Sequence, residues 1–329
     1  MFPAFAYVRP QGLQDAVDRL SRDHAHVHAG GTDLLGCLRD EVFPVQTLVS
    51  LSGVEGLDGI KGRSDGGLTI GAMTTLTTIA EHAEVNRLYP GLAQAAAAVG
   101  SPQLRNQGTL GGNLCQKPRC WYYRGDFHCL RKGGDHCYAV AGENQYHCIM
   151  GGEGCYIVHP SDTASALVSL DAEVQVVGPK GSRRIPVSEL HMRPAQDPTR
   201  ETVLADGEVI VQVNLPGPPS GLYSAYRKIR TRRSWDFAIA GCALALAMDG
   251  DTVRDCRVVL SAAAPVPWRS SETEHAIRGR PLDASAIQEA REAVVANAAP
   301  MTKNGYKLPL FKGMIEEELH RAAAAAVPG

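Results

Sequence analysis

Apolar residues near the N-terminus recur first at helical spacing and then in short runs typical of strands. Leu13, Ala16 and Val17 start a pattern that repeats every three or four positions and predicts an amphipathic helix. A strand, a Gly30-Gly31 turn, a short helix and a second strand come next, and this order predicts a compact α/β unit. The other ordered segments expected here are strands over residues 26–29, 47–51 and 67–72 and helices over residues 74–82 and 90–99.

The second half of the chain has mainly strand spacing. Ser161 or Asp162 caps a helix with an apolar face, and a hairpin over residues 173–187 and a strand over residues 209–215 follow it. Pro216 to Gly221 has the composition of a linker, so we expect a domain boundary there. The remaining segments are strands over residues 223–229 and 254–262, an apolar run over residues 238–248, and helices near residues 286–298 and 314–326. These patterns predict an α+β protein with two domains, residues 1–219 and 220–329.

Charge and composition narrow the class of protein. The chain has 329 residues and a formal net charge of −2, which argues against a general nucleic-acid surface. A basic run from Arg227 to Arg233 is a local exception, either a solvated strand end or a contact for phosphate or a partner subunit. No signal peptide or membrane-spanning run is evident. We therefore expect a cytoplasmic protein, or a periplasmic one if a partner carries the export signal.

Two glycine turns about eighty residues apart have the composition of an anion cradle. The first is Gly30-Gly31-Thr32, and the second runs from Gly108 to Asn113. Glycine allows close approach of the backbone, and successive backbone N–H groups attract phosphate. Neither turn fits the dinucleotide-binding or Walker pattern, which disfavours a Rossmann fold and a P-loop. The two turns together suit a pyrophosphate held from both sides.

Six of the nine cysteines follow the second glycine turn, between Cys115 and Cys155. The segment that contains them has little apolar periodicity, so hydrophobic burial alone could hardly fold it. Thiolates select zinc, copper(I) or iron–sulfur clusters. From Cys120 the intervals are C-x8-C-x7-C-x17-C, unlike the close pairs of zinc knuckles. We favour an iron–sulfur cluster over zinc, and zinc over disulfides, which belong to oxidising compartments and small scaffolds.

Five motifs point to a known family: Ala29 to Leu34, Gly108 to Asn113, Pro160 to Thr163, Leu170 to Ala172 and Tyr226-x-Lys228. Together they resemble the FAD-binding medium subunits of molybdenum hydroxylases such as xanthine dehydrogenase, aldehyde oxidoreductase and carbon monoxide dehydrogenase. The resemblance covers nearly the whole chain. It implies an FAD-binding domain of the vanillyl-alcohol-oxidase-like (PCMH) type, with subdomains of about residues 1–56 and 57–219, and a C-terminal α+β domain of antiparallel strands backed by helices.

The resemblance also implies a set of FAD contacts. Backbone N–H groups of the glycine turns and the Thr32 and Thr109 hydroxyls would hold the pyrophosphate. Asn113 and Asp162 would contact ribityl or ribose hydroxyls, and Lys228 would lie at the electron-rich edge of the flavin. The full set is Ala29, Gly30, Gly31, Thr32, Asp33, Leu34, Asn106, Gly108, Thr109, Gly111, Gly112, Asn113, Ser161, Asp162 and Lys228.

An insertion over about residues 116–156 is similar to one in 4-hydroxybenzoyl-CoA reductase and a bacterial aldehyde oxidoreductase of this family, where it holds an additional 4Fe–4S cluster. By order and context the implied ligands are Cys120, Cys129, Cys137 and Cys155, while Cys115 and Cys148 stay open as substitutes. Basic residues of the insertion should raise the reduction potential of the cluster by favouring its more negative, reduced state. These residues are Arg119, Arg124, Arg131 and Lys132.

The implied function is electron transfer, with no catalytic residue for substrate chemistry on this chain. The expected partners are a molybdopterin-binding large subunit and a small subunit with 2Fe–2S clusters, and a dimer of heterotrimers is one assembly that the resemblance implies. An external NAD, quinone, ferredoxin or oxygen would exchange electrons with the FAD. Two alternatives stay open: a free-standing FAD-dependent oxidase of the vanillyl-alcohol type, and a subunit whose cysteine loop is a zinc-stabilised interaction module.

Overall fold

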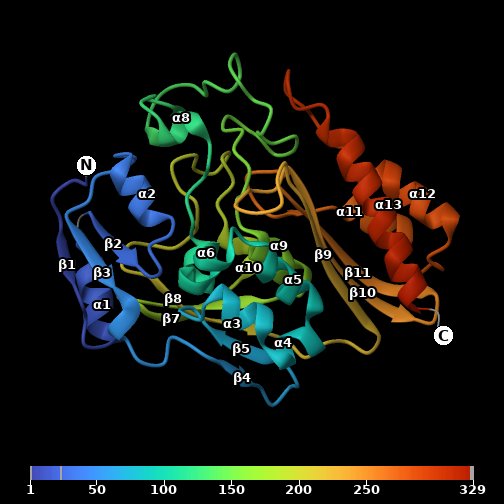
Figure 1. The fold of residues 1–329 in the computed structure, drawn as a ribbon, viewed down its shortest axis with the longest axis horizontal. Helices are drawn as coiled ribbons and strands as arrows, with labels where there is room; N and C mark the ends of the chain where they lie inside the picture. The colour runs from blue at the N-terminus through green and yellow to red at the C-terminus, as the bar shows by residue number, and fades with distance from the viewer. Residues whose placement is uncertain (1, 23, 327–329) are drawn as a thin grey trace.

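The computed structural model describes residues 2–22 and 24–326, and within them the strands form three sheets. The N-terminal unit is a parallel sheet of order β1-β3-β2 with helices beside it (Figure 1). Ala16, Val17 and Leu20 bury one face of the first helix in this unit, as the sequence pattern predicts. Its elements are β1 (Ala6–Val8), α1 (Leu13–Leu20), β2 (Ala25–His28), α2 (Leu34–Arg39) and β3 (Thr47–Ser50).

The central unit is an antiparallel sheet of order β4-β5-β8-β6-β7 covered by helices. Val174 and Val213 face each other in register across β6 and β8 and are fully buried under this cover. The strands are β4 (Ile60–Gly62), β5 (Leu68–Gly71), β6 (Glu173–Gly178), β7 (Gly181–Pro186) and β8 (Val209–Leu215). The helices are α3 (Leu76–Glu81), α4 (Ala83–Leu88), α5 (Pro90–Ala98), α6 (Pro102–Gln107), α7 (Leu110–Leu114), α9 (Asp162–Ser169) and α10 (Val187–Leu190).

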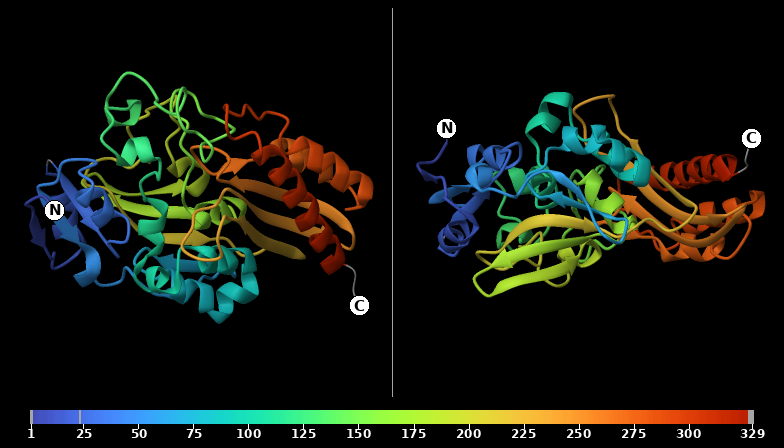
Figure 2. Two further views of the ribbon diagram at one scale, coloured as in Figure 1. Left: turned by 45° about the horizontal axis from the view of Figure 1, so that its top comes forward. Right: turned by 90° about the horizontal axis from the view of Figure 1, so that it is seen from below.

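The C-terminal unit is an antiparallel sheet of order β12-β11-β10-β9, packed between two sets of helices (Figures 1 and 2). Ala243 and Ala245 of β10 belong to the core under α5 and α9, whereas Leu244 and Leu246 belong to the core under α11 and α13. Because successive side chains of a strand point to opposite faces, β10 is apolar throughout. The elements are β9 (Leu222–Ile229), β10 (Ala240–Asp249), β11 (Thr252–Ser261), β12 (Trp268–Arg269), α11 (Ser271–Ile277), α12 (Ala284–Ala293) and α13 (Lys307–Ala326).

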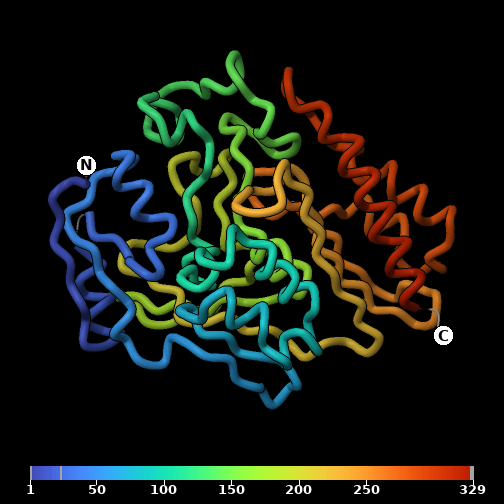
Figure 3. Tube along the Cα trace, in the orientation of Figure 1, coloured from blue at the N-terminus to red at the C-terminus, as the bar shows by residue number. Residues whose placement is uncertain are grey.

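The cysteine insertion has little regular structure, as the sequence predicts. It contains α8 (Trp121–Arg124) and the short 3-10 helix η2 (Leu130–Lys132), joined by irregular chain. The insertion lies above the central unit, and its later part runs beside the segment that precedes α13 (Figure 3). None of the helices in the described residues combines the length and apolar character needed to cross a bilayer.

The predicted α+β fold with antiparallel sheets and helices is confirmed, and the differences are local. The apolar run over residues 238–248 is the strand β10. Several short elements were not expected, namely the strands β1, β4 and β12 and the helices α4, α6, α7, α8, α10 and α11. The last helix begins at Lys307, seven residues before the expected start near Met314. Pro309 stands in its first turn, where the missing backbone N–H costs nothing because no partner exists there.

Candidate functional site

The two glycine turns are in direct backbone contact. A Cβ atom added to Gly30 would lie 1.9 Å from the Gln107 backbone oxygen, which is possible only for glycine. The second motif is a turn only at its start, because residues from Leu110 onward form α7. It is held against the residue after β5, since the backbone N–H of Gly111 donates to the Ala72 oxygen at 2.8 Å. Thr109 caps α7 by accepting a hydrogen bond from the Gly112 N–H at 3.2 Å. Turns eighty residues apart in sequence thus form one wall.

A cavity of about 490 Å³ opens between these turns and is the main candidate for the FAD site. Its size falls in the usual range for small-molecule and cofactor sites. Asn106 and Ser161 do not line it: Asn106 accepts a hydrogen bond from Thr77 on the surface, and Ser161 caps α9 through the Ala164 N–H. The predicted residues that line the cavity are Ala29, Gly30, Gly31, Thr32, Asp33, Leu34, Gly108, Thr109, Gly111, Gly112, Asn113, Asp162 and Lys228.

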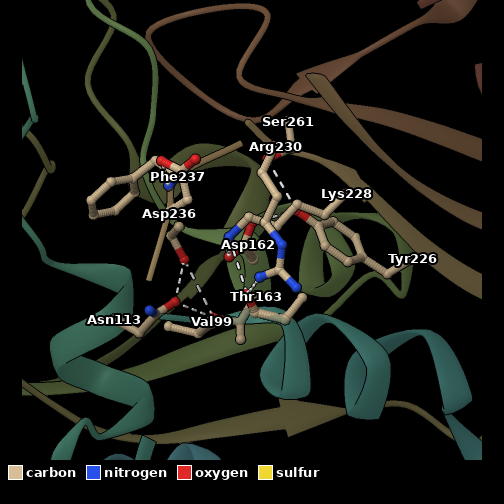
Figure 4. A network of polar contacts seen from close by, with 12 residues as sticks. Val99, Asn113, Asp162, Thr163, Tyr226, Lys228, Arg230, Asp236, Phe237 and Ser261 are labelled. Atoms are coloured by element: carbon tan, nitrogen blue, oxygen red, sulfur yellow. Dashed lines mark hydrogen bonds and ion pairs between the residues drawn. The ribbon is translucent and has the colours of Figure 1, made fainter. Parts of the chain in front are cut away.

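Asn113 is oriented by hydroxyls beneath the cavity. Its Oδ1 accepts a hydrogen bond from the Thr163 hydroxyl at 2.6 Å (Figure 4). It accepts a second one from the Ser161 hydroxyl at 2.5 Å. Because Oδ1 is fully used, the amide group is held in one orientation, and its Nδ2 has no hydrogen-bond partner among the described residues. Asn113 therefore offers donors to a ligand in the cavity, while Ser161 supports it from behind.

Asp162 joins α9 to β9 at the floor of the cavity. Its carboxylate accepts hydrogen bonds from the Tyr226 hydroxyl at 2.6 Å and from Lys228 Nζ at 2.7 Å (Figure 4). Lys228 Nζ also donates to the Ala98 oxygen at 3.1 Å. Burial, with the nearby Asp162 charge, raises the pKa of Tyr226 well above its ordinary value. Asp162 and Lys228 thus form a buried ion pair at the cavity wall, in which each charge compensates the other.

Asp33, predicted as a cofactor residue, holds the insertion against the first glycine turn. Its carboxylate pairs with the guanidinium groups of Arg119 and Arg124, each at 2.7 Å. It also accepts the Lys117 backbone N–H at 2.7 Å. The Asp33 carboxylate is therefore committed to three donors of the insertion, although the residue still borders the cavity.

Other residues that line the cavity carry no motif in the sequence. Glu201 lies in an irregular segment between α10 and β8. Trp235 and Phe237 follow the basic run, and the Arg119 guanidinium lies 4.7 Å from the centre of the Phe237 ring. No local pattern in the sequence predicts that Glu201, Trp235 or Phe237 lines this cavity.

The four cysteines assigned to a cluster line one small cavity in the insertion. Cys120, Cys129, Cys137 and Cys155 surround it, together with Arg131. Cys115 instead borders the large cavity, and Cys148 is buried without lining either one. Burial raises the pKa of Cys120 and of Cys148 to about 12.

The four thiols at this small cavity equal in number the ligands of a four-iron cluster. Within residues 2–22 and 24–326, no three His, Cys, Asp or Glu side chains converge closely enough to hold one metal ion. In a four-iron cluster each thiolate binds a different iron, so four thiols spread around a cavity are the expected arrangement. The cavity that they line measures only about 10 Å³, so side chains would have to rotate outward to hold a cluster.

The chain is similar to known proteins over its whole length. The family described as the FAD binding domain in molybdopterin dehydrogenase matches residues 3–218, and the CO dehydrogenase flavoprotein C-terminal domain matches residues 224–322. The chain is 36% identical to the aldehyde oxidoreductase FAD-binding subunit PaoB of Escherichia coli, over 98% of this chain and 99% of that protein. It is 26% identical to the carbon monoxide dehydrogenase medium chain of Hydrogenophaga pseudoflava, over 98% of both.

Solved structures show the same fold. A carbon monoxide dehydrogenase from Hydrogenophaga pseudoflava, lacking the Mo-pyranopterin moiety of its cofactor, superimposes with a TM-score of 0.78 at 25% identity, over 100% of both chains. The quinoline 2-oxidoreductase of Pseudomonas putida 86 gives a TM-score of 0.78 at 24% identity, over 100% of both chains.

Proposed function

Because the chain belongs to the FAD-binding medium subunits of the molybdenum hydroxylases, we propose that it passes electrons between iron–sulfur clusters and an external redox partner through FAD. It is an oxidoreductase subunit with the FAD-binding domain of that family. The observation that carries the proposal is the wall formed by the two glycine turns at a cavity of cofactor size.

The chain's own residues have distinct roles in holding the FAD. The backbone N–H of Gly31 and the hydroxyls of Thr32 and Thr109 would bind the pyrophosphate, whereas the Gly111 N–H is already bonded to the Ala72 oxygen. The Asn113 amide would donate to a ribityl or ribose hydroxyl. When bound, the flavin exchanges single electrons with iron–sulfur clusters and electron pairs with a nicotinamide or quinone. The proposal includes the division into residues 1–219 and 220–329, which the spans of the two matched families support.

The second part of the proposal is a 4Fe–4S cluster held by Cys120, Cys129, Cys137 and Cys155. Their common cavity supports this set over one that uses Cys115 or Cys148. We also propose a molybdopterin-binding large subunit and a 2Fe–2S small subunit as partners, because relatives are medium chains or FAD-binding subunits of such enzymes by name. The cytoplasmic location expected from the sequence stays a prediction.

The test is the cofactor content of anaerobically purified protein. We expect about four iron and four sulfide per FAD, and an EPR signal after dithionite reduction. Cys129→Ser or Cys137→Ser should lose that signal while keeping FAD. Cys148→Ser is the matched control, a buried cysteine outside the cavity, and it should keep both.

Other outcomes would overturn defined parts of the proposal. FAD with bound zinc, or with no metal, would remove the cluster and leave a structural loop on a flavin subunit. Folded protein that fails to bind FAD when FAD is supplied during preparation would contradict the electron-transfer role itself. Equal loss of signal in Cys148→Ser and Cys129→Ser would overturn the choice of ligands.

A further inference from the structure

One carboxylate of the large cavity pairs with a side chain of the cysteine cavity. Glu201 borders the large cavity, and its Oε1 pairs with Arg131 Nη1 at 2.9 Å, while Arg131 lines the cysteine cavity. The other carboxylate oxygen, Oε2, pairs with Nζ of Lys117, which lines the large cavity. Glu201 therefore links one cation from each side, and its side chain is only 12% exposed.

Arg131 faces the cysteine cavity with a buried charge. Its side chain is 1% exposed, and its Nη1 also donates to the Arg200 oxygen at 3.2 Å. Its Nε is buried and has no hydrogen-bond partner among the described residues, so the guanidinium keeps a free donor. Arg131 and Cys155 line the same small cavity, so a buried positive charge stands beside a proposed cluster ligand.

The remaining basic side chains of the insertion are used differently. Arg119 and Arg124 pair with Asp33, next to the first glycine turn. Lys132 donates to the Gly125 oxygen at 2.7 Å within the insertion. Of the four cations that the sequence suggested for tuning a cluster, Arg131 is the one that borders the cysteine cavity. We therefore expect Arg131, among these four residues, to have the main effect on the reduction potential of the cluster.

We propose that Glu201 is a counter-ion shared by the two cofactor sites, so that its charge affects the reduction potentials of both the cluster and the flavin. Arg131 is its paired cation on the cluster side, and Lys117 is its paired cation on the flavin side. This inference rests on the proposed function, because it needs both cofactors. Charges act strongly here because the three side chains are largely shielded from water. A fixed negative charge between the cofactors disfavours reduction of either one, and the paired cations offset that effect locally.

The experiment is a redox titration of the full chain loaded with both cofactors, with the cluster followed by EPR and the flavin by absorbance. Arg131→Gln should make the cluster about tenfold harder to reduce, a shift of about 59 mV to lower potential for one electron. Lys117→Gln should lower the flavin potential and leave the cluster nearly unchanged. Glu201→Gln should raise both potentials, which is the signature of a shared counter-ion.

Two controls separate the proposal from general damage to the fold. Lys132→Gln removes the same charge one residue away from Arg131 and should leave the cluster potential within the error of the titration. Arg131→Lys keeps the charge and should restore most of the potential lost in Arg131→Gln. The proposal is wrong if Glu201→Gln changes the reduction potential of only one cofactor or of neither. It is also wrong if Lys132→Gln shifts the cluster potential as far as Arg131→Gln does.

The outcome also distinguishes this inference from the proposed function. Unmodified protein without iron or without an EPR signal contradicts the cluster, and with it the coupling. If the unmodified protein holds both cofactors but Glu201→Gln leaves both reduction potentials unchanged, only the coupling is contradicted.

Discussion

Gly30 shows how strongly one missing side chain determines the FAD site. Its Cα hydrogen takes the place where a Cβ would lie 1.9 Å from a backbone oxygen, and a backbone atom cannot rotate away. Gly30→Ala should therefore force the two glycine turns apart, at a cost of at least about 1–3 kcal/mol in unfolding free energy. We expect FAD to be lost on gel filtration, as measured by its absorbance per protein.

The matched control is Gly12→Ala. A Cβ at Gly12 meets nothing within 4 Å, and its φ of −168° is extended backbone that alanine adopts. This variant should keep its FAD. Equal retention of FAD in Gly30→Ala would mean that contact between the turns is not needed for binding.

His191 should make the protein sensitive to mild acid. It lies against His159, with ring centroids 4.0 Å apart, and its Nε2 contacts the Leu114 backbone oxygen at 3.0 Å. Burial lowers the pKa of His191 to about 4, below its unfolded value of about 6.5. The unfolded chain thus binds the proton more tightly, so stability is complete above pH 6.5 and falls as the pH falls toward 4.

The measurement is urea denaturation at pH 7 and pH 5. Between pH 7 and pH 5, protonation of His191 should lower the free energy of unfolding by about 2 kcal/mol. His191→Gln, which can still donate to Leu114, should be less sensitive to pH than the unmodified chain by that amount. The same pH dependence in both proteins would contradict the assigned pKa.

Residue types explain which site residues could be predicted. Gly30 and Thr109 stand in turns whose composition alone indicates an anion site. Glu201 and Asp33 differ, because the function of a carboxylate depends on which cations reach it. The partners of Glu201 are 84 and 70 residues away in the chain, at Lys117 and Arg131. Such pairing follows from the fold and leaves no local pattern.

The cysteine insertion depends on a second element, the segment before α13. Asn304 is fully buried, and its Nδ2 donates to the His147 and Cys148 backbone oxygens at 3.1 and 2.9 Å. In the same contact, Asn144 Oδ1 accepts the Lys303 backbone N–H at 2.9 Å. A loop that lacks its own apolar core is thereby fixed by hydrogen bonds from the C-terminal unit.

Asn304→Ala should loosen the insertion. Two buried carbonyl groups lose their donor, which costs about 1–3 kcal/mol for each unsatisfied group. We expect faster hydrogen exchange over residues 143–150, measured by mass spectrometry. Asn297→Ala, at an exposed asparagine, is the control and should leave this exchange unchanged. Protection that persists in Asn304→Ala would show that the cysteine side of the loop is rigid by itself.

Elements with a simple periodic pattern were predicted nearly to the residue. β8 spans Val209–Leu215, as expected from its apolar run. β10 was recognised only as an apolar segment, since burial of both faces removes the alternation that marks a strand. Whether such a run is helix or strand is decided by its neighbours β9 and β11, which the local sequence does not contain.

The whole molecule is joined across the predicted domain boundary by a buried ion pair. Lys228 comes from β9 and Asp162 from α9, and both side chains are 4% exposed. Strand β9 packs on α5 of the FAD-binding part as well. The linker at residues 216–221 was visible in the sequence, but this interface was not, because it forms between segments more than sixty residues apart.

Lys228→Met should destabilise the whole chain. It leaves the Asp162 charge buried with the Tyr226 hydroxyl as its remaining partner, and breaking such a pair costs about 3–5 kcal/mol. The urea midpoint should fall accordingly, and FAD should bind more weakly because both residues line the cavity. Lys180→Met, at an exposed turn, is the control. A midpoint equal to that of Lys180→Met would contradict the importance of the pair.

The contact between the insertion and the segment before α13 can form only late in the synthesis of the chain. Ala299, whose backbone N–H binds the Ile149 oxygen, follows Cys155 by 144 residues (299 − 155). At a translation rate of about 5–20 residues per second, the segment that contains Ala299 is synthesised roughly 7–30 s after Cys155, the last of the four cysteines. During that interval the nascent thiols lack the segment that fixes their loop. Loading of a cluster is therefore expected after translation, on a released chain.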